Sequence, residues 1–417
     1  MDEWRTLKFV AAAIHMHLED SLPIATVLGN LEIASSQNVW KPFDARVTDY
    51  LSQLSRRIFS LPDIHELPGL VSLAYWIRPS AIHRLTQRHD GENYLIGRGM
   101  AFHIPPSNVP LNFAYSLFCG LLSGNSNVVR LSSTESIEAI TLVELMRIFH
   151  REESLHEVSA RVCLIRYEHD DSITRALSIK SAARVIWGGN ETVRRIRAIE
   201  TAPRSVDIVF ADRVSAALLQ SSHVEDLSND GLLQLVDNFI ADGYTFDQNA
   251  CSSPRLVIWH GTIDSVANAS SLFWQQLEQR LKLRETISAA HHMLRFIELC
   301  EHLSQHDISG QLVSVVGGAT RIKLVEGDDW RDFSKLRFGT FTEVTISNVE
   351  EVRHLVSSEV QTLGYFGYKT DEMVQMVKRL SADGIDRVVP IGQALNFDTL
   401  WDGYDLIRML TRTVVII

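Results

Sequence analysis

The feature that most constrains the fold of this chain is an alternation of apolar, strand-like runs with helical patterns, which begins at Tyr94. The runs are AFHI, NVVRL, RVCLI, ARVIW and DIVFA, and helical patterns follow Pro110 and Ser136 and begin again at Glu191. Strands that alternate with helices usually pair in parallel, because each helix returns the chain to the same edge of the sheet. We therefore expect an α/β fold with helices covering a parallel sheet.

The chain is too long for one hydrophobic core, so we expect more than one domain in its 417 residues. Residues 1–90 show helical patterns interrupted by prolines and carry no recognisable chemistry. A second α/β stretch follows a predicted helix at 231–242, which places the domain boundary near residue 230. The chain closes on the strand-like run TRTVVII.

Composition and charge exclude several classes of protein. A formal net charge of −11 and a pI near 5.8 argue against a surface that binds nucleic acid or an anionic membrane. The most apolar late stretch, 109–122, is too short to span a bilayer, and the N-terminus lacks the form of a secretory signal. Because the four cysteines are widely separated, we expect no disulfides and a cytoplasmic location.

One cysteine lies in a setting that suits chemistry. Cys251 falls in the run FDQNACSSP, where small and polar residues flank the thiol just before an apolar strand. A nucleophilic thiolate needs access for the substrate and nearby N–H groups to stabilise its charge. The alternative is a buried cysteine that acts as a small hydrophobe, which fits Cys119 and Cys163, and the local sequence leaves both possibilities open for Cys251. We expect no metal site, since His302 and His306 share a helix face but Cys300 does not.

Two other stretches have the form of strand, turn and helix. In the first, Asn108 precedes Pro110 and is either a helix N-cap or an amide donor to an oxyanion. Arg130 ends the next predicted strand, at the sheet edge where α/β proteins bind nucleotides, and the alternative is a plain surface arginine. In the second stretch, Trp187 is followed by Gly188 and Gly189 at the start of a helix, which could hold a pyrophosphate, but no full G-x-G-x-x-G is present.

Five motifs together resemble a known family. They are HIPPSNVPLNFAYSLFCGLLSGNSNVVRLSS, VIWGGNET, FDQNACSSPRLV, FGTFTEV and RVVPIGQALNFDTLWDGYDLIR, and they occur in the family's order from about residue 91 to the end. The sequence resembles the bacterial acyl-CoA reductases of the luminescence type, which are similar in turn to the aldehyde dehydrogenase superfamily. The resemblance implies a Rossmann-type nucleotide-binding domain, a smaller α/β catalytic domain and a C-terminal β oligomerisation arm.

The resemblance also implies a division of the chain. An N-terminal helical segment, 1–90, would pack on the cofactor-binding domain, 91–230. The catalytic domain with the nucleophilic cysteine would span 231–395, and 396–417 would form a terminal helix and an oligomerisation strand, so a homo-oligomer is expected.

Particular residues match the family's functional positions. Cys251 matches the nucleophile, and Asn108 matches the side chain that helps the Cys251 backbone N–H hold the oxyanion. Arg130 stands where the superfamily usually has a lysine on the adenosine ribose, and a guanidinium there favours NADPH over NADH. The expected cofactor-binding residues are Ser107, Arg130, Trp187, Gly188 and Gly189.

Two positions depart from the superfamily. Leu336 replaces the glutamate that hydrolysing aldehyde dehydrogenases place on the nicotinamide ribose. Glu200 has about the spacing of their water-activating glutamate, but Ala202 and Pro203 replace the usual glycine pair.

The hypothesis that follows is NADPH-dependent reduction of an acyl thioester to an aldehyde through an acyl-Cys251 intermediate. The donor would be an acyl-CoA or an acyl-protein, with an acyl-protein synthetase as a possible partner. Two alternatives stay open: a relay that transfers acyl groups through Cys251 without reduction, and an inactive reductase-like scaffold for an acyl-activating partner.

Overall fold

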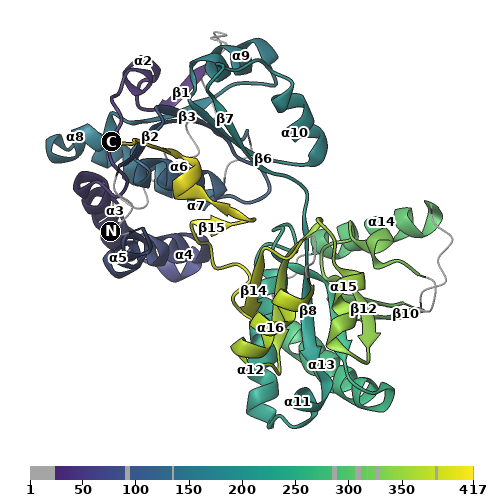
Figure 1. Cartoon of the computed structure of the whole chain (residues 1–417). Helices are drawn as coiled ribbons and strands as arrows, with labels where there is room; N and C mark the ends of the chain where they lie inside the picture. The colour runs from purple at the N-terminus through teal and green to yellow at the C-terminus, as the bar shows by residue number, and fades with distance from the viewer. Residues whose placement is uncertain are drawn as a thin grey trace. The chain divides into compact units, whose positions relative to one another are not determined.

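The structure is a computed structural model that describes residues 24–89, 94–133, 136–283, 289–305, 311–316, 318–324, 328–380 and 384–416. These residues form two units, each built around its own sheet (Figure 1). Unit 1 contains the described residues up to Ala211, with Phe397–Leu400 and those from Tyr404 onward. Unit 2 contains the described residues of Asp212–Asn396 and Trp401–Gly403. The functional division of the chain into four parts stays a prediction.

Unit 1 has a sheet in the order β1-β5-β4-β3-β6-β7, and every neighbouring pair is parallel except β1 with β5. The expected α/β fold with a parallel sheet is therefore confirmed. The strand order reverses between β3 and β6, so the carboxyl ends of these central strands form the edge where open α/β sheets bind ligands. The strands are β1 (Ala25–Leu28), β3 (Met100–Ile104), β4 (Ser126–Arg130), β5 (Val162–Arg166), β6 (Ala183–Trp187) and β7 (Val206–Phe210).

Strand β1 lies inside the part of the chain that we expected to be helical. Its four residues are too few to show an alternating pattern, and it adds to the sheet as an antiparallel edge strand.

Helices cover both faces of the unit 1 sheet. Along β4, Val128 packs in the core beneath α9 and α10, whereas Val129 packs in the core shared with α3, α6 and α7. Figure 1 shows α9 and α10 on one side of this sheet. The helices are α2 (Leu31–Ser35), α3 (Ala45–Phe59), α4 (Pro68–Trp76), α5 (Pro79–Arg88), α6 (Asn112–Leu122), α7 (Ile137–Phe149), α8 (His156–Ser159), α9 (Asp171–Lys180) and α10 (Asn190–Arg197).

Unit 2 has a sheet in the order β10-β11-β12-β9-β8-β13-β14, parallel except for β10 with β11. One core lies between this sheet and helices α11 to α13, and a second lies on the opposite face with α15 and α16. The strands are β8 (Val214–Gln220), β9 (Pro254–His260), β10 (Gln311–Val316), β11 (Ala319–Lys323), β12 (Thr340–Ile346), β13 (Val360–Phe366) and β14 (Arg387–Pro390). The helices are α11 (Ser221–Glu225), α12 (Asn229–Tyr244), α13 (Ile263–Leu283), α14 (Ala289–Gln305), α15 (Val352–Leu355) and α16 (Thr370–Leu380).

The end of the chain passes through β15 (Leu400–Trp401), β16 (Tyr404–Asp405) and α17 (Leu406–Met409) to β17 (Thr411–Thr413). Strand β17 pairs antiparallel with β2 (Leu95–Gly97) of the same chain. Val415 and Ile416, which follow β17, are exposed, and the expected homo-oligomer stays a prediction. Among the described residues, no helix combines the length and apolarity that a membrane crossing requires.

Candidate active site

Cys251 lies in the turn between α12 and β9, at the amino edge of the unit 2 sheet, and its side chain is half-buried. The Ser215 hydroxyl holds this turn by donating to the Cys251 carbonyl at 2.7 Å. Ser215 Oγ in turn accepts the Thr362 N–H at 3.1 Å, so the turn is fixed to two neighbouring strands. The small residues after Cys251 are buried, which lets the backbone enter β9 directly.

Gln248 anchors the cysteine turn from within the protein. Gln248 is fully buried, and both it and Asp247 have a left-handed backbone, with φ of 57° and 50°. Its amide nitrogen donates to the carbonyls of Pro254 and Thr340, each at 3.0 Å. Its amide oxygen accepts the N–H groups of Gly339 at 2.7 Å and Thr340 at 3.2 Å. The motifs FDQNACSSPRLV and FGTFTEV, far apart in sequence, therefore meet through one side chain.

Two arginines lie next to this turn. Arg255 donates to the carbonyls of Ser334 at 2.6 Å and Gln248 at 3.2 Å, which holds its guanidinium close to the cysteine turn. Arg337 donates to the Asn249 side chain at 2.9 Å and forms an ion pair with Glu298 of α14 at 2.6 Å. Cationic side chains around a thiol favour its ionised form.

The pKa of Cys251 results from opposing influences. Burial is the largest, and it raises the pKa of the thiol, while the carboxylates of Asp212 and Asp402 act in the same direction. The backbone N–H of Arg213 and the guanidinium of Arg255 lower the pKa of Cys251 by stabilising the thiolate. The net direction is upward, so the resting thiol is mostly protonated at neutral pH.

The other cysteines have different surroundings. Cys119 and Cys163 are fully buried, and burial raises the pKa of Cys163 to about 12. Burial also raises the pKa of Cys119, with no arginine opposing it. The interpretation of these two as buried hydrophobes is confirmed, whereas Cys300 is exposed on α14. Cys251 therefore combines partial access with a nearby guanidinium.

The predicted residues of unit 1 lie along one edge of its sheet. Ser107 and Asn108 follow the end of β3, Arg130 ends β4, and the turn of Gly188 and Gly189 follows β6. Because β3 pairs in parallel with both β4 and β6, these carboxyl ends lie next to one another.

The N-cap interpretation of Asn108 is wrong. Helix α6 begins at Asn112 with Leu111 as its cap, because the chain first makes a turn in which the Asn112 N–H donates to the Val109 carbonyl. Asn108 and Ser107 are both exposed before this turn.

The glycine turn has features that suit a phosphate. Gly189 is the N-cap residue of α10, so the capping position itself has no side chain and leaves room at the helix start. The Gly188 N–H donates to the Phe210 carbonyl at 3.0 Å, and a Cβ on Gly188 would lie 3.2 Å from the Thr192 side chain. The turn can therefore bring the backbone at the start of α10 close to an anion.

A basic cluster lies beyond the ends of β4 and β5. The guanidinium groups of Arg130 and Arg195 each place Nη2 3.3 Å from His169 Nδ1. Arg130 also lies 4.7 Å above the ring of Tyr167 and donates to its carbonyl at 3.3 Å. The sequence pattern indicated Arg130, but His169 and Arg195 gave no separate signal.

The two departures from the superfamily have structural consequences. Leu336 is buried with Leu299, Ile322 and Phe333, so an apolar contact occupies that position. Glu200 is exposed and forms an ion pair with Arg175.

No cluster of three or more metal-ligating side chains occurs among the described residues, and His306 lies outside them.

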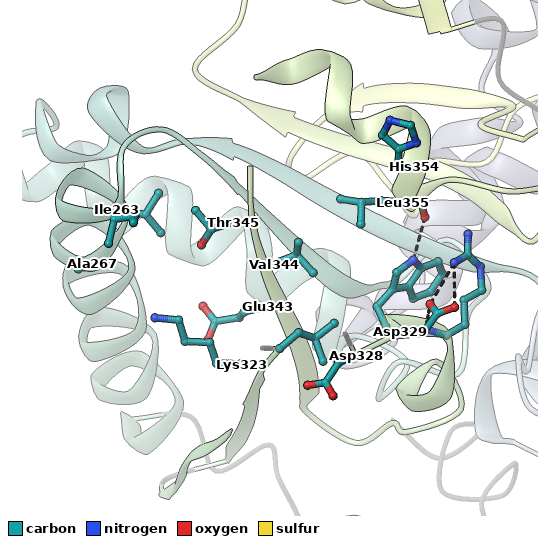
Figure 2. Close-up of a pocket in the computed structure, with 14 residues that line it drawn as sticks. Ile263, Ala267, Lys323, Asp328, Asp329, Glu343, Val344, Thr345, His354 and Leu355 are labelled. Carbon is teal, nitrogen blue, oxygen red and sulfur yellow. Dashed lines mark hydrogen bonds and ion pairs between the residues drawn. The ribbon is translucent and has the colours of Figure 1, made fainter. Parts of the chain in front are cut away.

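Unit 2 also has an open pocket of about 700 Å³, which Cys251 does not line. Figure 2 shows Glu343, Val344 and Thr345 of β12 along it, with Ile263 of α13 on one side and His354 on another. Glu343 is buried and accepts hydrogen bonds from the indoles of Trp259 at 2.8 Å and Trp274 at 2.7 Å, and from Arg321 at 2.8 Å.

The arrangement of the elements defines an aldehyde dehydrogenase fold. The structure of 1-pyrroline-5-carboxylate dehydrogenase from Thermus with bound NAD matches with a TM-score of 0.65 at 12% identity, covering 99% of this chain and 96% of that one. Aldehyde dehydrogenase 21 from Physcomitrella patens matches with a TM-score of 0.62 at 14% identity, covering 89% and 84%. These identities support the fold alone.

Within that fold, residues 66–413 match the family model described as acyl-CoA reductase (LuxC), and the chain belongs to this family. The resemblance that the five motifs indicated is thus confirmed. The long-chain acyl-protein thioester reductase of Aliivibrio fischeri is 26% identical over 187 residues, covering 44% of this chain and 35% of that protein. The enzyme of the same name from Vibrio harveyi is 21% identical over 331 residues, covering 78% of this chain and 65% of its own length. The chain therefore spans less than two thirds of either relative.

Proposed function

We propose that this protein reduces an acyl thioester to an aldehyde, with Cys251 as the acyl carrier and NADPH as the reductant. The observation that carries the proposal is the setting of Cys251, a half-buried thiol on an anchored turn beside the Arg255 guanidinium. Membership of the acyl-CoA reductase family supports the reaction class.

In the first step, the Cys251 thiolate attacks the carbonyl carbon of the thioester. A bond forms between Cys251 Sγ and that carbon, and the bond to the donor sulfur breaks, so the donor leaves as a thiol after taking up a proton. The Cys251 backbone N–H and the Asn108 amide would stabilise the oxyanion of the tetrahedral intermediate. Arg255 favours the Cys251 thiolate that starts this step.

In the second step, the acyl group on Cys251 is reduced. The nicotinamide, when bound, supplies a hydride to the acyl carbon. The carbonyl oxygen takes up a proton, and the resulting thiohemiacetal breaks its carbon–sulfur bond, which releases the aldehyde and returns Cys251 to its starting state. Overall, one thioester, one NADPH and one proton give one aldehyde, one thiol and one NADP⁺.

The residues at the edge of the unit 1 sheet fit such a cofactor. The start of α10, which follows Gly188 and has Gly189 as its N-cap residue, suits the pyrophosphate. The convergence of Arg130, Arg195 and His169 suits a 2′-phosphate, because guanidinium groups bind phosphate through paired hydrogen bonds. This cluster is the reason for proposing NADPH rather than NADH.

The acyl donor belongs to the same proposal. The relatives from Aliivibrio fischeri and Vibrio harveyi are named as acyl-protein thioester reductases. We therefore include an acyl-protein beside acyl-CoA as a donor, with an acyl-protein synthetase as the partner that loads it.

The test is a kinetic assay with purified protein, a long-chain acyl-CoA and NADPH. We expect NADPH oxidation that Cys251→Ala abolishes and Cys300→Ala leaves intact, since Cys300 is the exposed cysteine on α14. Release of coenzyme A without NADPH oxidation would indicate the relay without reduction. An unchanged rate in Cys251→Ala would contradict the proposal.

A further inference from the structure

A continuous chain of hydrogen bonds crosses the buried interior of unit 1 and ends at the residue before the glycine turn. Trp187 Nε1 lies 3.1 Å from Ser116 Oγ on α6, and Ser116 Oγ lies 2.7 Å from His103 Nδ1 on β3. His103 Nε2 lies 3.0 Å from Asn127 Oδ1 on β4. Asn127 Nδ2 then donates to the Asn125 carbonyl at 3.1 Å. All five residues are buried.

The direction of each hydrogen bond follows from the partners. The Asn127 amide nitrogen donates to a carbonyl, which turns its Oδ1 toward His103, and an amide oxygen can only accept. His103 Nε2 therefore carries the proton, and its Nδ1 accepts the Ser116 hydroxyl. The Ser116 oxygen is then left to accept the indole N–H of Trp187. Burial lowers the pKa of His103 to about 4, which agrees with a neutral ring.

A glycine in α6 makes room for this network. A Cβ on Gly120 would lie 1.9 Å from Asn127 Oδ1 and 3.1 Å from His103 Nε2. Glycine inside a helix is less favourable than alanine, because it loses more conformational freedom on folding. The space that Gly120 leaves is filled by the hydrogen-bonded amide and ring.

The network and one aromatic contact together fix the Trp187 side chain. The indole stacks on Phe210 of β7 with ring centroids 3.6 Å apart and an angle of 12° between the planes. This contact sets the plane of the indole, and the hydrogen bond to Ser116 sets its rotation within that plane. The next residue, Gly188, is bonded to the same Phe210 through its backbone N–H.

We propose that Ser116 and His103 are positioning residues for the cofactor: through the Trp187 indole they hold the backbone of the Gly188–Gly189 turn in the geometry that binds the pyrophosphate. This inference rests on the proposed function. A buried network in which every bond has one direction supports a single arrangement, whereas apolar side chains of similar size would fill the same space without fixing the rotation of the indole.

The test compares two variants that each remove one buried serine hydroxyl from unit 1. Ser116→Ala breaks the bond to Trp187, whereas Ser55→Ala on α3 breaks a hydrogen bond to the Ala74 carbonyl at 2.8 Å, far from the turn in sequence and outside the network. For each full-length protein, the melting temperature and the dissociation constant of NADPH are measured, the latter by energy transfer from protein tryptophan. Trp187→Phe and the Ser116→Ala/Trp187→Phe double variant complete a double-mutant cycle.

We expect both serine variants to melt at a lower temperature, because each leaves a buried partner unsatisfied. Only Ser116→Ala should raise the dissociation constant of NADPH, roughly tenfold, and the effect should disappear in the Trp187→Phe background. In ¹⁵N spectra of the wild type, the indole N–H signal that Trp187→Phe removes should shift in Ser116→Ala.

The outcomes separate this inference from the proposed function. If the wild type binds neither NADPH nor NADH, the proposed function fails and the inference with it. If the wild type binds NADPH and Ser116→Ala binds it equally well, the inference alone is overturned, and the network serves only the stability of the fold. Equal losses of binding in Ser116→Ala and Ser55→Ala would overturn it in the same way.

Discussion

At the scale of single residues, the environment of the sulfur distinguishes Cys251 from the other cysteines. Burial raises the pKa of Cys119, Cys163 and Cys251, but of these three only Cys251 has a guanidinium acting in the opposite direction. Arg255 follows it by four residues, and this short separation places the charge at the start of the next strand. The sequence pattern therefore indicates the reactive thiol but not Arg255, whose guanidinium lowers the pKa of that thiol.

Removing the charge of Arg255 should make Cys251 less reactive. In Arg255→Met, the pKa of the thiol should rise further above its ordinary value, because the thiolate loses its nearby positive charge. Alkylation by iodoacetamide near pH 8 should slow by roughly two- to tenfold, with the midpoint of its pH profile shifted upward. Arg255→Lys keeps the charge and is the control. Identical pH profiles for wild type and Arg255→Met would contradict this assignment.

The basic cluster should decide between the two nicotinamide cofactors. Replacing Arg130 or Arg195 by methionine should raise the KM for NADPH roughly tenfold and leave the KM for NADH nearly unchanged, since only NADPH carries a 2′-phosphate. Arg194→Met changes a neighbouring exposed arginine on α10 and is the matched control. Equal effects on both cofactors would argue against a 2′-phosphate site here.

At the scale of secondary-structure elements, the cysteine turn depends on the strand that neighbours it. Gln248 joins the start of β9 to the start of β12 through four hydrogen bonds of one amide. In Gln248→Glu, a carboxylate would face the carbonyls of Pro254 and Thr340. We expect a loss of roughly 2–4 kcal/mol in the free energy of unfolding and slower acylation of Cys251.

The matched control for that change is Gln234→Glu, which places the same charge on the exposed side of α12. Denaturant titration and the burst of coenzyme A released in a single turnover measure the two effects. Stability and burst in Gln248→Glu that equal those of Gln234→Glu would show that the amide does not hold the turn.

Much of the element pattern could be predicted from the sequence, and the failures have physical causes. Buried parallel strands such as β5 and β6 contain the apolar runs VCLI and VIW, which makes them easy to recognise. The short edge strand β1 has no such pattern. The sequence is also compatible with Asn108 as a helix cap, because local sequence does not show how long the chain runs before α6 begins.

The candidate site was predictable only where its residues lie within one motif. Cys251, Gly188 and Gly189 have local signals, because each needs small neighbours or a particular turn. Ser116 and His103 lie in apolar runs, and their pairing with Trp187 depends on the order of β3, β4 and β6 in the sheet. Contacts of this kind arise from tertiary structure, which periodicity does not report.

At the scale of the whole molecule, the match to the acyl-CoA reductase family includes residues of both units. The assignment of cofactor binding to one unit and of the nucleophile to the other is part of the proposal. Unit 1 contains Asn108 and the residues proposed to bind the cofactor, and unit 2 contains Cys251. The acyl group on Cys251 is the intermediate that links the two proposed steps, so the mechanism depends on it.

That claim is tested most directly by peptide mass spectrometry of the protein after a single turnover with acyl-CoA, before and after addition of NADPH. We expect an acyl group on the peptide that contains Cys251 when the cofactor is absent. When NADPH is added, this label should be lost, with one equivalent of aldehyde formed. An acyl group found on Cys300 instead, or one on Cys251 that NADPH does not remove as aldehyde, would contradict the account.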